Sequence, residues 1–307
     1  LDAALLTELL GASIRIATPL LLAAIGGILS ERSGTFAVAI EGMMLAGAFG
    51  AAVATLTTGS IAAGIAASLL CGMLIALVVA VATARFRTDH MVTGLAVNIL
   101  AAGLTSYLLR ALFGGRAPVI RLPVLEPWRI PLLADIPIVG PALFNQPPLT
   151  YFAFAVLVPL GIAIARSRAG LLLRATGENP SAVYAAGADP IRIRMAAILG
   201  CGGFAGLAGA ALVLQQVGSF TDGMTHGRGF IALAALIVGR WAPVPVALAC
   251  LAFGLVSAIA LRAQGWGLPV SSYVVQMMPY ILALVGLAGI GRAARLPAAI
   301  GTAFRKH

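Results

Sequence analysis

Charged residues are scarce in this 307-residue chain, where Asp, Glu, Lys and Arg together make up 10% of the sequence. A soluble domain carries roughly 25%. Hydrophobic residues make up 61% of the chain, and the mean hydropathy is +1.03. This balance leaves no room for a second, soluble domain, so the composition predicts a single polytopic membrane domain over residues 1–307.

Cysteine and histidine are equally rare, at three residues each. Cys71, Cys201 and Cys250 lie far apart in apolar runs, which excludes a disulfide framework and metal-ligand spacing, so we expect no metal site. The sequence also lacks Walker A, Gly-x-Ser-x-Gly and His-Glu-x-x-His motifs. We therefore expect no catalytic residues. Uphill transport by this chain would draw on an ion gradient or on a partner that hydrolyses ATP.

Acidic residues are half as many as basic ones, 10 against 20. Such an excess can indicate nucleic-acid binding, but here the charges fall in the breaks between apolar runs, where the positive-inside rule explains them. We therefore expect the chain to lie in a lipid bilayer and to bind no nucleic acid. The sequence begins at Leu1, which leaves open a trimmed start or a missing upstream segment.

Apolar runs separated by polar breaks make up most of the sequence. They predict an all-α bundle of about nine transmembrane helices (eight to ten), and short or broken helices among them are expected to surround a central path. The fifth and seventh runs are shorter than the roughly 20 residues of a straight crossing. The expected spans are residues 9–29, 35–55, 61–82, 91–112, 151–165, 191–217, 230–238, 246–261 and 272–290.

The longest break covers residues 114–149 and is rich in proline, which excludes a continuous spanning helix there. Glycine is also frequent, at 36 residues, as expected where small residues let helices approach closely in lipid. Gly202 and Gly206, four positions apart, predict one such close helix contact. This motif is structural and carries little information on function.

Basic residues are divided unevenly between the two sets of breaks. If the loop at residues 166–194 is cytoplasmic and the breaks alternate, thirteen of the 20 basic residues lie on the cytoplasmic side. The C-terminus is then cytoplasmic, the loop at 114–149 faces outward, and the N-terminus is outside if the count of nine is right. The thirteen residues are Arg32, Arg85, Arg87, Arg166, Arg168, Arg174, Arg192, Arg194, Arg240, Arg292, Arg295, Arg305 and Lys306.

The polar stretch at residues 174–194 carries a full set of helix signals. Asn179 can accept hydrogen bonds from the next free amides, and Pro180 follows at the first helical position, where its missing N–H costs nothing. Gly187 allows the left-handed backbone that ends a helix. Asp189, again before a proline, repeats the start signal. The pattern predicts a surface helix of about two turns that a soluble partner can hold, with an ordinary interhelical loop as the alternative.

Polar side chains within the apolar runs are the candidates for a translocation path. A lipid-facing, ionised Glu41 would be costly, so we expect it to face a cavity or a cation, or to bridge two helices. The amide side chains can equally form interhelical hydrogen bonds, and Met224 can be a packing residue. The candidates are Glu41, Asn98, Gln215, Gln216, Met224 and Gln276.

Several segments together resemble the membrane permeases of ABC importers of the branched-chain amino acid, ribose and nucleoside group. The stretch Gly177–Gly187 resembles their cytoplasmic coupling segment. Further segments point to the nucleoside or simple-sugar type: Glu31–Gly34 followed by Ile40–Met44, then Gly223–Ala234 and Met278–Tyr280. The resemblance covers nearly the whole chain, and its specificity lies in the combination of segments.

The resemblance implies a multi-pass permease of the bacterial inner membrane that moves a small polar solute inward by alternating access. It implies a nucleoside or purine-like solute, or a simple sugar as the alternative. The implied partners are a second permease subunit, related or identical, an extracytoplasmic solute-binding protein and a cytoplasmic ATPase. ATP and Mg would be bound by the ATPase, with no cofactor in this chain. The implied ATPase-coupling residues are Gly177, Glu178, Asn179, Pro180, Tyr184, Gly187 and Asp189.

One departure from the family pattern leaves the solute open. Ala37 and Ala39 stand where such permeases often have Asn and Gly before the Glu-Gly-Met-Met word. Two functions of other classes also remain: an ion-coupled carrier that depends on Glu41, and a membrane scaffold that transports nothing.

Overall fold

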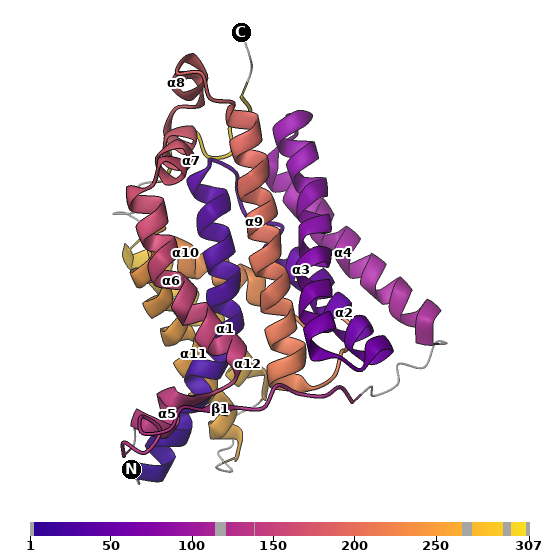
Figure 1. The fold of residues 1–307 in the computed structure, drawn as a ribbon, viewed down its shortest axis with the longest axis vertical. Helices are drawn as coiled ribbons and strands as arrows, with labels where there is room; N and C mark the ends of the chain where they lie inside the picture. Colours follow the sequence, from indigo (N-terminus) through magenta and orange to yellow (C-terminus); the bar gives the residue numbers. More distant parts are fainter. Residues whose placement is uncertain (1–2, 114–120, 138, 266–271, 291–295, 305–307) are drawn as a thin grey trace.

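The computed structural model of the protein is a bundle of helices, most of which run along its long axis (Figure 1). The structure describes residues 3–113, 121–137, 139–265, 272–290 and 296–304. The elements, in chain order, are α1 (Ala3–Arg32), α2 (Ile40–Thr58), α3 (Ile61–Ala80), a π-helical turn (Val81–Arg85), α4 (His90–Phe113), β1 (Trp128–Arg129), α5 (Val139–Phe144), β2 (Asn145–Gln146), α6 (Pro148–Arg166), α7 (Arg168–Glu178), α8 (Pro180–Ala185), α9 (Pro190–Ala211), a second π-helical segment (Leu212–Val217), α10 (Arg228–Val238), α11 (Pro243–Gly265) and α12 (Ser272–Ile290). Apart from the short antiparallel pair β1–β2, the described elements are helical, which confirms the all-α prediction.

Each of the nine predicted spans corresponds to a helix. Within the described residues, seven helices are long and apolar enough to cross a bilayer, and two shorter apolar helices occur at Arg228–Val238 and Met277–Gly286. With 11 residues, α10 is roughly 16 Å long, about half the hydrocarbon thickness of a membrane. The prediction of a short seventh helix is therefore confirmed.

Two predicted boundaries are wrong, for local reasons. The second helix begins at Ile40 and not at residue 35, because side chains bind the backbone just before it: Glu31 Oε1 accepts from Ala37 N at 3.3 Å, and Asn98 Nδ2 donates to Val38 O at 2.9 Å. The fifth span is 19 residues long and not short. It begins at Pro148 because a proline at the first helical position breaks no hydrogen bond.

Helices α1 and α9 form the centre of the bundle (Figure 1). They pack on one another and, like the first half of α2, are buried along most of their length. By contrast, α3, α4 and α6 present exposed apolar faces, which include Leu70, Leu74, Val92, Ile99 and Val158. Such faces are what lipid tails contact in a membrane bundle.

Glycines let α2, α3 and α9 approach at backbone distance. A Cβ built on Gly206 of α9 would lie 2.2 Å from Ser68 O, and one built on Gly72 of α3 would lie 2.2 Å from Gly202 O. On α2, a Cβ at Gly47 would lie 2.4 Å from the Cα of Gly206. No side chain fits at these crossings, which confirms the close packing predicted from Gly202 and Gly206.

We expect Gly206→Ala to lower the free energy of unfolding by about 1–3 kcal/mol, the usual cost of overpacking. The new methyl group would overlap backbone atoms that cannot move without shifting a whole helix. The thermal midpoint of the purified protein in detergent measures this. Gly203→Ala is the matched control on the same helix, because its Cβ would meet its nearest neighbour at 3.7 Å. Equal midpoints for the two variants would contradict the packing described.

Candidate functional site

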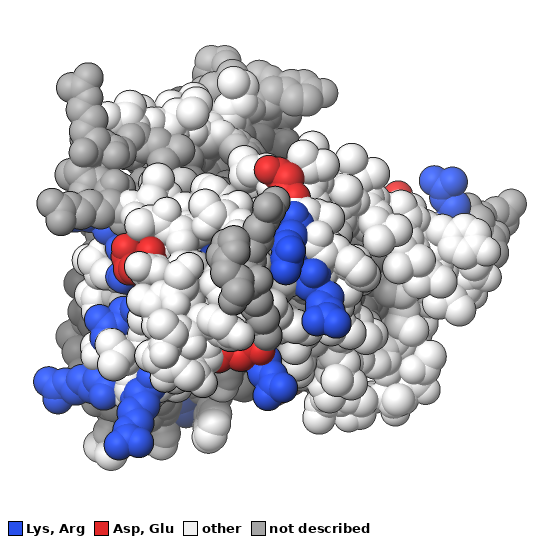
Figure 2. Space-filling view, turned by 90° about the horizontal axis from the view of Figure 1, so that it is seen from above, with Lys and Arg blue, Asp and Glu red and all other residues white. Residues whose placement is uncertain are grey.

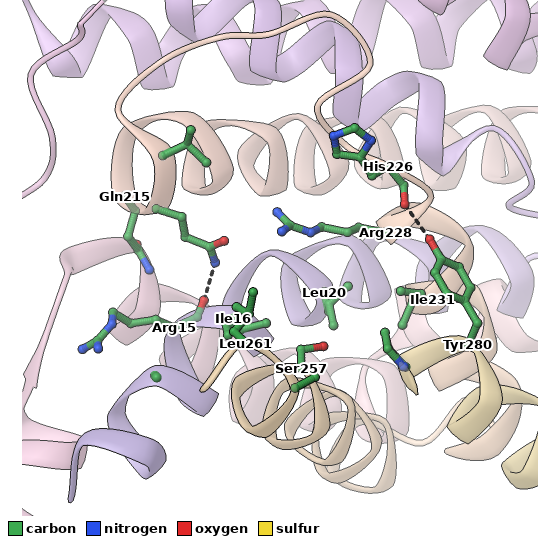
Figure 3. Close-up of a pocket in the computed structure, with 15 residues that line it drawn as sticks. Arg15, Ile16, Leu20, Gln215, His226, Arg228, Ile231, Ser257, Leu261 and Tyr280 are labelled. Atoms are coloured by element: carbon green, nitrogen blue, oxygen red, sulfur yellow. Dashed lines mark hydrogen bonds between the residues drawn. The ribbon is translucent and has the colours of Figure 1, made fainter. Parts of the chain in front are cut away.

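A cavity of about 700 Å³ lies between α1, the π-helical segment Leu212–Val217, α10, α11 and α12 (Figure 3). Small-molecule sites commonly have volumes of about 300–1,000 Å³. The cavity is lined by residues 12–20 of α1 and by the π-helical segment that follows α9, so it lies in the half of the bundle away from α8. Its polar lining consists of Arg15, Gln215, Gln216, His226, Arg228, Ser257 and Tyr280.

The end of α9 continues as the π-helical segment Leu212–Val217, which closes at Gly218 with φ +67°. Such wider turns often mark functional sites. Here the segment sends two consecutive glutamines to different neighbours: Gln215 Nε2 donates to Thr150 Oγ1 at 2.8 Å, and Gln216 Nε2 donates to the carbonyl of Arg15 at 2.6 Å. Both predicted glutamines therefore line the cavity, and among the described residues the buried Gln215 Oε1 has no hydrogen-bond partner.

Part of the proline-rich break lies against this π-helical segment. Leu122 N donates to Gly218 O at 2.8 Å, and Leu125 N donates to Leu214 O at 2.7 Å. The break predicted to face outward thus contacts the π-helical segment that lines the cavity.

Glu41 bridges two helices and is not among the residues that line the cavity. Its carboxylate oxygens accept hydrogen bonds from Gly227 N at 2.8 Å and Gly229 N at 2.7 Å. These N–H groups lie at the start of α10, where a helix has no internal partners for them and where its dipole favours a negative charge. Of the alternatives for Glu41, the structure therefore matches a bridge between α2 and α10.

Two further path candidates lie away from the cavity. Asn98 Oδ1 accepts from Gly42 N at 2.8 Å and its Nδ2 donates to Val38 O at 2.9 Å, so both ends of the amide bind the backbone near the start of α2. Met224 is buried in the hydrophobic core. Asn98 therefore matches the alternative of an interhelical hydrogen bond, and Met224 matches that of a packing residue. The side chain of Gln276 lies outside the described residues.

Sequence reasoning missed Arg15, Arg228 and Tyr280. Arg228 points into the cavity (Figure 3), and its Nη1 is buried without a hydrogen-bond partner among the described residues. The Tyr280 hydroxyl donates to His226 O at 2.6 Å. Signals were available: Arg15 lies inside the predicted first span, and an arginine within a span is by default a functional candidate. Arg228 and Tyr280 lie in two of the segments that carry the family resemblance.

The opposite end of the bundle carries α7, α8 and the C-terminal segment 296–304 (Figure 1). Helix α7 was not predicted, but the caps around α8 were. Asn179 Oδ1 accepts from Ala182 N at 3.0 Å, Gly187 has φ +87°, and Asp189 Oδ1 accepts from Ile191 N at 3.0 Å at the start of α9. The predicted surface helix and its capping residues are confirmed.

Helix α8 projects from the bundle and buries one of its six residues, Val183. The exposed Tyr184 ring lies 5.7 Å from that of Phe304, and Glu178 Oε2 accepts from Ala298 N at 3.3 Å. Figure 2 looks onto this end, where basic side chains outnumber acidic ones. The end therefore offers a protruding helix within a basic surface.

Buried contacts join α7 to the end of α1 and to the C-terminal segment. A Cβ at Gly177 would lie 2.3 Å from Arg32 O, and Gly177 O accepts from Ala299 N at 2.8 Å. The buried Arg194 donates from Nε to Ser33 O at 3.2 Å, from Nη1 to Thr302 O at 2.7 Å and from Nη2 to Ala299 O at 3.3 Å. The segment around α8 is therefore fixed to α1, a helix that lines the cavity.

Comparison with known proteins identifies the family. Residues 9–285 match the family described as branched-chain amino acid transport system / permease component. The chain belongs to this permease family. No solved structure matches it.

Three relatives illustrate the range of named solutes. The permease is 35% identical to the nucleoside ABC transporter permease protein NupC of Lactococcus lactis, over 94% of each chain. It is 33% identical to the guanosine ABC transporter permease protein NupQ of Bacillus subtilis, over 98% of each chain. It is also 34% identical to the putative glucose ABC transporter permease protein TsgC13 of Haloferax volcanii, over 85% of this chain and 79% of that one.

In the permease, a further set of hydrogen bonds joins the end of α1 to the residues just after α10. Trp241 Nε1 donates to Glu31 Oε2 at 2.5 Å, and Arg32 Nε and Nη2 donate to Trp241 O at 3.3 and 3.2 Å. Helix α10 is thus held by side chains at both ends, by Glu41 at its start and by Glu31 and Arg32 just after its last turn. Both α1 and α10 connect the end that carries α8 with the cavity.

We expect Glu41→Gln to lower the free energy of unfolding of the permease by about 1–3 kcal/mol, the cost of an unpaired buried polar group. An amide presents one acceptor oxygen where the carboxylate presents two, so one N–H at the start of α10 loses its partner. Thermal unfolding in detergent measures the change. Glu126→Gln, at an exposed position, is the control, and equal midpoints for the two variants would contradict the role of Glu41.

Proposed function

We propose that this chain is the membrane subunit of an ATP-binding-cassette importer that carries a nucleoside or a related purine compound into the cell. The observation that carries the proposal is a solute-sized cavity in one half of the bundle and a protruding, well-capped helix at the opposite, basic end. The similarity to permeases named for nucleosides and guanosine over 94% and 98% of the chain supports the choice of solute.

In this proposal, α8 and its neighbours contact a cytoplasmic ATPase that binds ATP and Mg, and this chain holds no cofactor. The coupling residues of the sequence analysis, from Gly177 to Asp189, lie around α8. A push on α8 would reach the cavity through α7 and α1, because Gly177 packs against Arg32 O. It would reach the start of α10 through the contact of Arg32 with Trp241. Movement of α1 against α10 would then open the cavity to one side of the membrane at a time.

The remaining partners follow from the same arrangement. A second permease subunit, related or identical, completes the membrane part. An extracytoplasmic solute-binding protein docks on the end formed by residues 121–137 and 218–227. The protein lies in the bacterial inner membrane, with α8 and the C-terminus in the cytoplasm and the N-terminus outside, because the surface at the end with α8 is basic (Figure 2) and basic residues favour the cytoplasmic side.

Two alternatives have less support. A simple sugar as solute is favoured by the similarity to a putative glucose permease. An ion-coupled carrier would need Glu41 free to bind a cation or a proton, whereas both of its carboxylate oxygens accept hydrogen bonds from the start of α10.

The proposal is tested by uptake of radiolabelled nucleosides into vesicles that contain the co-purified complex and its binding protein. We expect accumulation that requires ATP in the compartment facing the ATPase. Accumulation driven by an ion gradient without ATP would contradict the importer. ATP-dependent uptake of sugars with no uptake of nucleosides would keep the importer and replace the solute.

We expect Gly187→Val to separate ATP hydrolysis from transport. A β-branched residue at φ +87° costs roughly 1–3 kcal/mol and would change the end of α8 without meeting any side chain, since nothing lies within 4 Å of a Cβ there. The readouts are solute-stimulated ATPase activity and uptake in the same vesicles.

Gly59→Val is the matched control for this variant. Gly59 also has a positive φ, +69°, with nothing within 4 Å of a Cβ, but it closes α2 at the opposite end of the bundle. Backbone strain alone would affect the two variants alike. If uptake and stimulated ATPase activity stay normal in Gly187→Val, the coupling role of this helix is wrong.

A further inference from the structure

Hydrogen-bond donors and acceptors are unevenly represented among the groups that line the cavity. Arg15 and Arg228 each offer five N–H donors and no acceptor. Among the described lining residues there is no carboxylate, and neither arginine forms an ion pair with a described acidic side chain. The cavity therefore offers more hydrogen-bond donors than acceptors.

Several acceptors on the elements around the cavity already accept hydrogen bonds. The carbonyl of Arg15 accepts from Gln216, and that of His226 accepts from Tyr280 (Figure 3). Both carboxylate oxygens of Glu41 bind backbone N–H groups of the turn that carries Arg228. By contrast, Nη1 of Arg228 is buried and has no hydrogen-bond partner within the described part of the chain.

The direction of the side chains singles out Arg228. In Figure 3 its guanidinium reaches across the cavity from the start of α10, whereas that of Arg15 points away toward the edge. An unpaired, buried guanidinium N–H carries a desolvation cost that a solute acceptor removes, and charge-assisted hydrogen bonds are the strong ones. A solute that presents an acceptor to Arg228 is stabilised, and one that presents a donor there is not.

Purine nucleosides differ in whether they present a hydrogen-bond acceptor or a donor at position 6 of the base. Guanine has acceptors at O6 and N7, which an arginine can bind together, whereas adenine has an amino donor in place of O6. Hypoxanthine, the base of inosine, carries the same carbonyl oxygen as guanine. The buried Gln215 Oε1, also without a partner among the described residues, can accept a hydrogen bond from an N–H of the solute.

We propose that Arg228 determines the specificity of the site by binding the carbonyl oxygen of a 6-oxopurine, so that the permease takes inosine and guanosine in preference to adenosine. This inference rests on the proposed function, since it specifies the solute class of that importer. The apolar part of the lining, which includes Ile16, Leu20 and Ile231, packs against the flat base.

The test is equilibrium binding of radiolabelled inosine and adenosine to the purified permease–ATPase complex. The solute-binding protein is left out so that its own selectivity does not enter. The two probes place a carbonyl oxygen or an amino group at the same position of the base. We expect the complex to bind inosine more tightly. We expect Arg228→Met to weaken inosine binding by about tenfold to a hundredfold, as for the loss of a charge-assisted hydrogen bond, with a much smaller effect on adenosine.

Two more variants distinguish a role of Arg228 in solute recognition from a purely structural role. Arg228→Lys keeps a charged donor and is expected to restore part of the preference for inosine. Arg110→Met, at an exposed position on α4, is the control for loss of an arginine and should keep the wild-type ratio. If the role of Arg228 were only structural, Arg228→Met would weaken the binding of inosine and adenosine equally. An unchanged ratio of the two affinities would therefore overturn the inference.

Failure of this inference is distinguishable from failure of the proposed function. If the wild-type complex binds the two probes equally but accumulates nucleosides with ATP, the importer stands and the role of Arg228 is wrong. If no nucleoside is accumulated under any condition, the solute of the proposed function is wrong and this inference fails with it, whether or not the importer itself stands.

Discussion

Two hydrogen bonds from Gly227 and Gly229 to the Glu41 carboxylate hold the half-length helix α10 in place. A helix that begins inside a membrane protein has no bulk water to bind its first N–H groups, so they need partners from the protein itself. Glu41 supplies them from α2. Arg228 projects from the same turn, and the wall that α10 gives to the cavity depends on this contact. Glu41, an acidic residue within an apolar run, thus stabilises one wall of the cavity without lining the cavity itself.

The sequence contains enough information for the helices and for the caps, because both depend on local chemistry. A bilayer requires that backbone groups bind within each helix, so long apolar runs correspond to helices. Asn179, Gly187 and Asp189 act on amides a few residues away. The cavity is different, because its walls come from α1, the π-helical segment after α9, α10, α11 and α12, which meet only after folding. The direction of Arg228 and the partners of Glu41 and Asn98 depend on those long-range contacts. So does the late start of α2, where side chains of α1 and α4 bind the backbone of residues 37 and 38.

Helix α1 is shared between the two ends of the molecule. Its first half lines the cavity, and its last residues contact Gly177 and Trp241. The centre of this helix is packed against α9 at close range: a Cβ at Gly26 would lie 2.7 Å from Cys201 O. Packed interiors are only slightly compressible. A displacement at one end of α1 therefore has to move α9 with it or slide along it, which favours rigid-body motion over local bending.

The C-terminal segment 296–304 also bears on how the protein is made. Ala299 N binds Gly177 O, Gly301 N binds Gly34 O, and two carbonyls of the segment receive Arg194. Ribosomes deliver these residues after all the described helices, from α1 to α12, have been synthesised. The surface around α8 consequently stays incomplete while these helices are made and inserted, and it is completed when segment 296–304 folds back on it. A partner that recognises the completed surface would assemble only with chains in which this segment has folded.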